Sequence, residues 1–194
     1  MEILSFKAPP VNKKEILRYM KSGETQEVCS LIKECLIEAE KVLSYNLVYE
    51  KFPIRFFDES ADNGLIDLCF AKVYSKDLHK NLRNFNEIIL FAASVGIGID
   101  RLIARYSILS PSKALCFQAI GAERVEALCD KFNDEIKAQY RKTAPRFSPG
   151  YGDLDLALQK EIFKALPMQK IGVSLGDSLL MSPSKSVTAI IGID

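Results

Sequence analysis

The chain has 194 residues, of which 48% are hydrophobic and 26% charged, values typical of a globular protein. This length fits one domain with its own hydrophobic core, and we expect a single domain over residues 1–194. The formal net charge of +1 argues against binding to nucleic acid or to anionic lipid through bulk electrostatics.

No segment of the sequence indicates export, membrane insertion or a disulfide framework. The five cysteines are an odd number and include no Cys-x-x-Cys pair. We therefore expect the cysteines to be reduced and to pack as small hydrophobic side chains in the core, in a reducing compartment. The N-terminus has no basic region followed by an apolar core, and the apolar run over residues 88–99 is too short to span a bilayer. We predict a cytoplasmic protein with no membrane partner and, with one histidine, no protein-ligated zinc.

Two helices are predicted near the N-terminus. Asn12 can cap a helix that extends to about Met20, and Glu15 stands at the position of a capping-box partner. Apolar residues then recur at spacings of three and four over residues 28–43. This period is typical of a helix with one buried face.

A strand and a hairpin are predicted next. Residues 46–57 alternate in polarity, but Pro53 cannot donate to a ladder, so we expect an edge strand or a strand bent there. Asp62-Asn63-Gly64 is a turn signal, and residues 65–70 are the predicted hairpin partner.

The middle of the chain predicts a buried strand between helices. We expect a short helix over residues 75–84, a buried strand over 87–93 and a helix over 99–106. Ser110 and Pro111 suit the N-cap and first turn of the longest helix.

The last part of the chain returns to strands. Residues 143–152 are irregular, and Asp153 can cap a helix that ends near Leu166. Short strands are predicted over residues 171–175 and 186–193. Strands and helices do not alternate regularly, which favours an α+β fold over a doubly wound sheet.

The irregular segment Arg146-Phe147-Ser148-Pro149-Gly150-Tyr151 has the composition of an anion-binding loop. Arg146 is a permanent planar cation that can grip a carboxylate with two parallel hydrogen bonds. Pro149 and Gly150 suit a tight turn, and Tyr151 offers a flat face and a hydroxyl at its exit. We expect this loop to form part of a small-molecule site.

Three other features of the sequence allow both a functional and a simpler structural interpretation. Glu126 lies at the rim of a buried helix face, where it is either a solvated acid or a carboxylate that meets a cationic ligand. Residues 94–98 follow a strand and precede a helix, but they lack the third glycine and the Lys-Ser/Thr of phosphate-binding loops. Close backbone packing is the better interpretation. His79, among charged neighbours, is expected to be exposed.

Two motifs, taken in order, resemble the C-terminal activation domain of cobalamin-dependent methionine synthase. The first is Arg146-x-x-x-Gly150-Tyr151, and the second is Asp177-Ser178-x-x-Met181-x-Pro183-x-x-Ser186-Val187. In that family they read Arg-x-x-x-Gly-Tyr-Pro-Ala-Cys-Pro and Leu-Thr-Glu-Ser-x-Ala-Met-x-Pro-x-x-Ser-Val. Residues 91–96 and 121–126 are also similar to free-standing relatives of the domain, so the resemblance covers residues 85–190.

The resemblance implies a twisted antiparallel sheet with flanking helices and a site for S-adenosylmethionine. Arg146 matches the arginine that holds the ligand's carboxylate, and Tyr151 matches the tyrosine beside it. Glu126 aligns with a helix glutamate that faces the ligand, while Ser148 and Gly150 would supply backbone contacts. No catalytic or metal-binding residue is implied.

The function implied by the resemblance is that of a stand-alone reactivation module. It would support the reductive methylation of cobalamin on a partner methionine synthase, with an electron from a flavodoxin-like or other donor. The cobalamin would lie on the partner because the Asp-x-His-x-x-Gly signature is absent here. The chain would be one component of a methyltransferase system rather than a complete enzyme.

Two alternatives remain open at this point. Gly152 and Asp153 replace the family's Pro-Ala-Cys-Pro, and few residues follow the second motif. These departures favour an interaction module that caps a corrinoid protein without binding the ligand. A small-molecule methyltransferase is the third hypothesis, although the acidic-Gly-x-Gly-x-Gly loop after a first strand is missing.

Overall fold

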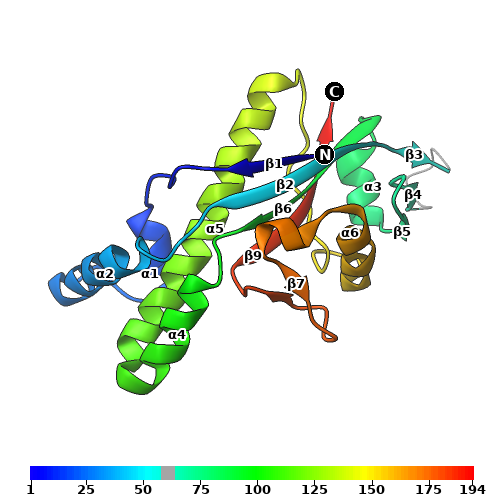
Figure 1. Cartoon of the computed structure of the whole chain (residues 1–194). Coiled ribbons are helices and arrows are strands. Elements are labelled where there is room, and N and C mark those ends of the chain that lie inside the picture. Colours follow the sequence, from blue (N-terminus) through cyan, green and yellow to red (C-terminus); the bar gives the residue numbers. More distant parts are fainter. Residues whose placement is uncertain (58–63) are drawn as a thin grey trace.

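The computed structural model describes residues 1–57 and 64–194, and Figure 1 shows its helices and strands. The elements and their bounds, in chain order, are β1 (Glu2–Ser5), α1 (Lys13–Met20), α2 (Gln26–Ala39), β2 (Asn46–Pro53), β3 (Arg55–Phe56), β4 (Leu65–Asp67), β5 (Lys72–Tyr74), α3 (Lys76–Leu82), β6 (Glu87–Ser94), α4 (Gly98–Leu109), α5 (Pro111–Gln139), η1 (Leu156–Leu158), α6 (Gln159–Ala165), η2 (Met168–Ile171), β7 (Ser174–Leu175), β8 (Met181–Ser182) and β9 (Ser186–Ile193).

A four-stranded sheet lies at the centre in the order β1-β2-β6-β9, and every neighbouring pair is antiparallel. β6 pairs with β9 over eight residues, from Glu87 opposite Ile193 to Ser94 opposite Ser186. The smaller sheets β3-β4-β5 and β7-β8 lie at its periphery (Figure 1). The predicted α+β fold with an antiparallel sheet and flanking helices is therefore confirmed.

Both faces of the central sheet are buried, which explains why β6 reads as a continuous apolar run. Successive side chains of a strand point to opposite faces. Ile89 and Phe91 therefore enter one apolar cluster, formed with α1, α2, α4 and α5. Ile88 and Leu90 enter a second cluster, formed with α3, η1, α6 and η2. The helices thus form two layers around the sheet (Figure 1).

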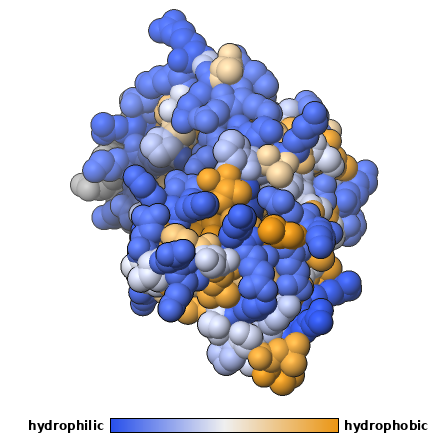
Figure 2. Space-filling view, turned by 90° about the vertical axis from the view of Figure 1, so that its left-hand side faces the viewer, coloured by the Kyte–Doolittle hydropathy of each residue, from blue (hydrophilic) through white to orange (hydrophobic). Residues whose placement is uncertain are grey.

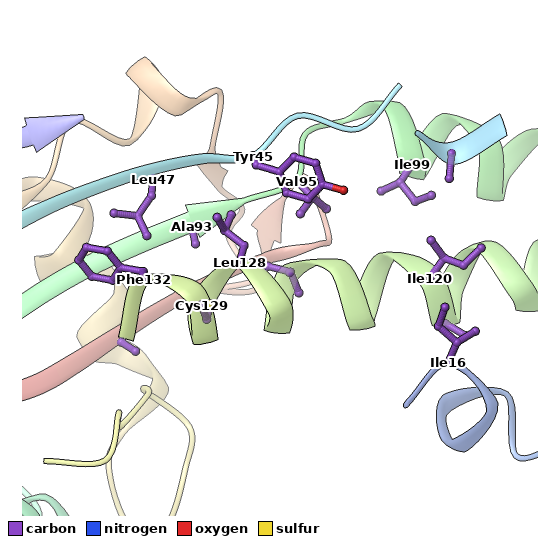
Figure 3. Packing of buried hydrophobic residues seen from close by; sticks show 14 of the residues in the cluster. Ile16, Tyr45, Leu47, Ala93, Val95, Ile99, Ile120, Leu128, Cys129 and Phe132 are labelled. Carbon is purple, nitrogen blue, oxygen red and sulfur yellow. The ribbon is translucent and has the colours of Figure 1, made fainter. Parts of the chain in front are cut away.

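The 29-residue helix α5 is the main support of the first layer. In Figure 3, Leu128 and Phe132 of α5 face Leu47 in the sheet, and Ile16 of α1 lies beside Ile120. The predicted first-turn proline is confirmed at Pro111. None of the described helices is long and apolar enough to cross a membrane. The face of the molecule that carries α1 and α2 is mainly hydrophilic, with separate hydrophobic patches (Figure 2).

One prediction on strands is wrong, and another is confirmed over a shorter range. β2 lies between β1 and β6 rather than at an edge, and the chain leaves it at Pro53. The β1 ladder ends at the pair Glu2–Tyr49, so Pro53 stands beyond its end and removes no hydrogen bond to β1. The hairpin partner is confirmed over residues 65–67, which pair with β3. Residues 62 and 63 of the predicted turn lie outside the described residues.

His79 is buried rather than exposed, with 4% of its surface accessible. Its ring packs edge-on against Phe56, with 4.9 Å between the ring centroids. The charged neighbours in sequence, Lys76, Asp77 and Lys80, are exposed on the rest of α3. His79 lies next to Leu78 and three residues before Leu82, both fully buried, so the inward face of this short helix includes it.

A buried ion pair joins the N-terminal segment to α5. Glu123 and Arg124 are 2% and 1% exposed, and Arg124 Nε lies 2.6 Å from Glu123 Oε2. Arg124 also donates to the carbonyl oxygens of Pro9 and Pro10, at 2.6 and 2.7 Å. The Asn12 N–H donates to Glu123 Oε1 at 2.9 Å. Glu123 therefore takes the role that a capping box would give to Glu15, whose carboxylate pairs with Arg18 instead.

Removing Glu123 is expected to destabilise the protein strongly. Glu123→Ala leaves a buried guanidinium without its counter-ion, which costs about 3–5 kcal/mol. Urea denaturation measures the free energy of unfolding. Glu135→Ala, on the exposed side of the same helix, is the matched control and should change it by less than about 0.5 kcal/mol. Similar values for the two variants would contradict the assigned role of the buried pair.

Candidate functional site

A cavity of about 440 Å³ contains part of the predicted site. Its walls come from α5, the segment that follows α5, the start of α6, and the segment that leads through β8 into β9. The described residues that line it are Glu126, Arg146, Ser148, Pro149, Leu156, Gln159, Leu179, Leu180, Met181, Ser184, Ser186, Val187 and Thr188. Both sequence motifs therefore meet in one place.

Main-chain hydrogen bonds to β9 position the Arg146 loop. The Phe147 N–H donates to the Ile190 carbonyl at 2.9 Å, and the Ile190 N–H donates back at 2.8 Å. The Ala144 N–H donates to the Gly192 carbonyl at 2.8 Å. Phe147 is 8% exposed and belongs to the second apolar cluster. The loop thus runs beside β9 as a short additional strand, and Arg146 and Ser148 flank its anchored residue.

Arg146 is held between two carboxylates of α5. Its Nη1 lies 2.6 Å from Asp130 Oδ1, and its Nη2 forms an ion pair with Glu126. Burial acts to lower the pKa of Arg146, but the hydrogen bond to Asp130 and the nearby acids outweigh it and raise the pKa. The guanidinium is therefore a fixed cation at the cavity wall. One positive and two negative charges give this cluster an excess of one negative charge.

Three of the five predicted site residues, Arg146, Ser148 and Glu126, line the cavity, and two do not. Gly150 adopts a φ of +84°, as a turn glycine should, but its N–H already donates to the Leu154 carbonyl at 2.8 Å. Tyr151 is 71% exposed, and its ring contacts Phe147 edge-on with 5.6 Å between centroids.

Sequence reasoning missed a buried polar pair in the cavity wall. Gln159 of α6 and Thr188 of β9 are 4% and 2% exposed, and the Thr188 hydroxyl donates to Gln159 Oε1 at 3.1 Å. The signal was present in the helical period, since Gln159 precedes the buried Ile162 by three residues and falls on the apolar face. A polar residue at an apolar position indicates either a satisfied core pair or a site.

The segment before β9 is tied to α4. The Ser184 N–H and hydroxyl both donate to Asp100, at 2.7 and 2.6 Å. The Ser186 hydroxyl lies 3.0 Å from the Ser94 hydroxyl at the end of β6. These bonds fix the base of the segment, while Leu180, farther along it, is 67% exposed at the cavity rim.

The side chains that line the cavity can bind a ligand that is charged at one point and apolar at another. Cys129 lies on α5 near Arg146, and burial raises the pKa of its thiol to about 12, so it stays protonated. Within residues 1–57 and 64–194, no group of three His, Cys, Asp or Glu side chains could hold a metal ion. The remaining groups are a guanidinium, carboxylates, hydroxyls, an amide and an apolar wall.

A larger groove of about 930 Å³ lies between α1 and α5 and shares Glu126 with the site. Several of its acids are already paired, Glu15 with Arg18 and Glu123 with Arg124. It contains neither Arg146 nor a residue of the second motif. We therefore place the candidate site in the smaller cavity.

Asp153 caps a different helix from the one predicted. Its carboxylate accepts hydrogen bonds from the Ser75 hydroxyl and from the N–H groups of Lys76, at 2.8 Å, and Asp77, at 3.2 Å. It thereby caps α3, and Asp155 caps η1 by accepting from the Ala157 N–H at 2.8 Å. The exit of the Arg146 loop is therefore pinned to the start of α3.

Stability should depend on the ionisation of Asp153. The hydrogen bond from Ser75, followed by those from the two N–H groups, lowers the pKa of Asp153 below its ordinary value of 3.8. A lowered folded-state pKa contributes stability above the unfolded pKa that is lost as pH falls through the folded pKa. Melting temperatures of wild type and Asp153→Asn between pH 6 and 2 test this, with exposed Asp134→Asn as the control. The Asp153→Asn protein should be less stable at pH 6 and should lose less stability below about pH 4. Parallel pH curves would contradict the capping role.

The comparisons with known proteins bear on the fold. No family model and no curated protein matches the sequence. Among solved structures, the chain is similar to the MetH reactivation domain bound to AdoHcy (S-adenosylhomocysteine), with a TM-score of 0.73 and 14% sequence identity. The match covers 99% of this chain and 78% of that chain. The chain therefore has the fold of the MetH reactivation domain, as the two motifs predicted.

Proposed function

We propose that this protein binds S-adenosylmethionine in the cavity beside Arg146 and serves as a reactivation module for a cobalamin-dependent methionine synthase. The observation that carries the proposal is the Arg146 cluster, which stands at the cavity wall of a chain with the fold of the MetH reactivation domain. The ligand bound to that structure, AdoHcy, is the product that S-adenosylmethionine leaves after methyl transfer.

The residues present fit the ligand's charges. S-adenosylmethionine carries a carboxylate, an ammonium and a sulfonium, and so has a net charge of +1 at neutral pH. Arg146 can receive the carboxylate, and Glu126, which also lines the cavity, can face the ammonium or the sulfonium, while Asp130 holds Arg146 from outside the cavity. The cluster's excess negative charge matches the ligand's excess positive charge. Apolar side chains, among them Leu156 and Met181, line the rest of the cavity.

The protein's contribution would be binding and orientation. When bound, S-adenosylmethionine supplies the methyl group, which the reduced cobalt on the partner chain accepts. Catalysis would come from proximity and alignment of the methyl donor rather than from acid–base groups of this chain. The exposed side chains of Tyr151 and Leu180 would lie on the side that meets the partner. The electron that reduces the cobalt on the partner chain would come from a flavodoxin-like or other donor.

An interaction module that binds no ligand is the second candidate. The engaged N–H of Gly150 and the exposed position of Tyr151 favour it, because neither residue makes the contact expected of the first motif. Such a module would retain a cobalamin-binding methionine synthase in a pull-down while showing no heat of binding with S-adenosylmethionine. Methyl transfer without any corrinoid protein would instead support a small-molecule methyltransferase.

Isothermal titration calorimetry with S-adenosylmethionine tests the ligand claim. Arg146→Ala should weaken binding about 10- to 100-fold, because a charge-assisted pair is worth about 1.5–3 kcal/mol. Arg141→Ala removes an exposed arginine outside the cavity and should bind as wild type does. The absence of binding by the wild-type protein would overturn the proposal.

Glu126→Gln should change the preference between charged and uncharged sulfur. S-adenosylmethionine has the sulfonium that AdoHcy lacks, and Glu126 contributes one of the two negative charges of the cluster. Loss of that charge should lower the ratio of the affinity for S-adenosylmethionine to the affinity for AdoHcy roughly fivefold. This corresponds to ~1 kcal/mol of attraction between partly screened charges. Competition binding measures the ratio, and Glu161→Gln, a partly exposed glutamate outside the cavity, is the control. An unchanged ratio would show that Glu126 does not face the sulfur.

A further inference from the structure

Gln159 and Thr188 are the polar side chains that lie deepest in the wall of the candidate site. Both are more than nine-tenths buried, and both line the cavity. They come from different elements, α6 and β9, and their neighbours Leu158, Ile162 and Ile190 belong to the second apolar cluster. A polar pair in such surroundings is costly unless its hydrogen-bonding groups are satisfied.

The hydrogen bonds of this pair are incomplete. A glutamine amide has two N–H donors and an oxygen with two lone pairs. The bond from the Thr188 hydroxyl uses one lone pair of Gln159 Oε1, and it is the one hydrogen bond of this side chain within residues 1–57 and 64–194. Two donors and one lone pair remain. The amide nitrogen of Gln159 is not among the buried side-chain atoms of the described residues that lack a partner, so its two donors reach the open cavity, where a ligand group that supplies an acceptor can pair with them.

The unused groups of Gln159 match one edge of adenine. Adenine presents an amino donor at position 6 next to a ring-nitrogen acceptor, and glutamine pairs with such an edge through two hydrogen bonds. Hypoxanthine has a carbonyl oxygen at position 6, so it cannot donate to the amide oxygen. Leu156, Met181 and Val187 line the same cavity and can contact the faces of a flat ring.

We propose that Gln159, held in place by Thr188, pairs with the 6-amino edge of the nucleobase and makes the site selective for adenine. This inference rests on the proposed function, since it assigns the base of the same nucleoside ligand. Arg146 and Gln159 line the same cavity from different wall elements, so one ligand molecule can contact both. Gln159 acts as a specificity residue and takes no part in methyl transfer.

The test compares two ligands that differ at position 6 of the base. Calorimetry should show that wild type binds S-adenosylhomocysteine about 5- to 100-fold more tightly than S-inosylhomocysteine, the range expected for one bidentate base contact. Gln159→Leu should bring the two affinities to within twofold of each other. Thr188→Val, which keeps the amide but removes the hydroxyl that orients it, should lower the preference by a smaller factor.

Controls separate a base contact from a merely structural pair. Gln169→Leu, on an exposed part of η2 outside the cavity, should keep the wild-type preference. If Gln159→Leu does not fold, as judged by circular dichroism, the near-isosteric Gln159→Glu replaces it, because a carboxylate also lacks the N–H donors. A folded variant that keeps the wild-type preference, or a wild type without any preference, overturns this inference alone. A wild type that binds neither ligand overturns the proposed function as well.

Discussion

The candidate site depends on the two hydrogen bonds between Phe147 and Ile190. Residues 143–147 form no regular helix or strand, and these hydrogen bonds hold them beside β9. β9 is in turn fixed along its other edge by eight residue pairs with β6. Arg146 is thereby placed against α5, and Ser148, two residues on, lines the same cavity. A shift of two residues in this pairing would move the guanidinium by more than 6 Å, roughly two strand rises.

Under the proposed function, the paired carboxylates of α5 would prepare Arg146 for a ligand rather than block it. A guanidinium has five N–H donors, and the two ion pairs described here involve one nitrogen each. Donors therefore remain for a third carboxylate without loss of the first two. The acids also hold a long side chain in one orientation, so less conformational entropy is lost when the ligand binds. Arg146 alone would have signalled an anion site, whereas the cluster as a whole suits a zwitterion with an added positive charge.

How far the sequence predicts this structure depends on the range of the interactions involved. Helix starts at Asn12 and Pro111 and the buried strand β6 follow from local caps and periodicity, and they are correct within a few residues. The prediction that Asp153 caps the helix that follows it was wrong, because its partners are more than 70 residues away at the start of α3. Nothing in the local sequence distinguishes the cap of one helix from that of another. The prediction that His79 is exposed was wrong for the same reason, since it packs against Phe56, which is distant in the sequence. Arg146 was predicted from a motif and Glu126 from an alignment of its helix with the family. Gln159 stood at an apolar helix position, but its partner Thr188 became known only from the pairing of α6 with β9.

The two walls of the cavity differ in construction, and this difference suggests how a ligand would be divided between them. One wall is α5, a 29-residue helix stabilised along its length by apolar packing and by the buried Glu123–Arg124 pair. The other includes the short elements η1, α6 and β8, which have two to seven residues each. The charged groups stand on or against α5. Their positions must be held accurately if they are to distinguish a ligand by its charges. The apolar and amide groups stand on the wall of short elements, which a flat base can hold together by filling the space between them. The proposed ligand, with a charged amino-acid end and an aromatic base, would therefore bind in one orientation, with its charges toward α5 and its base toward α6.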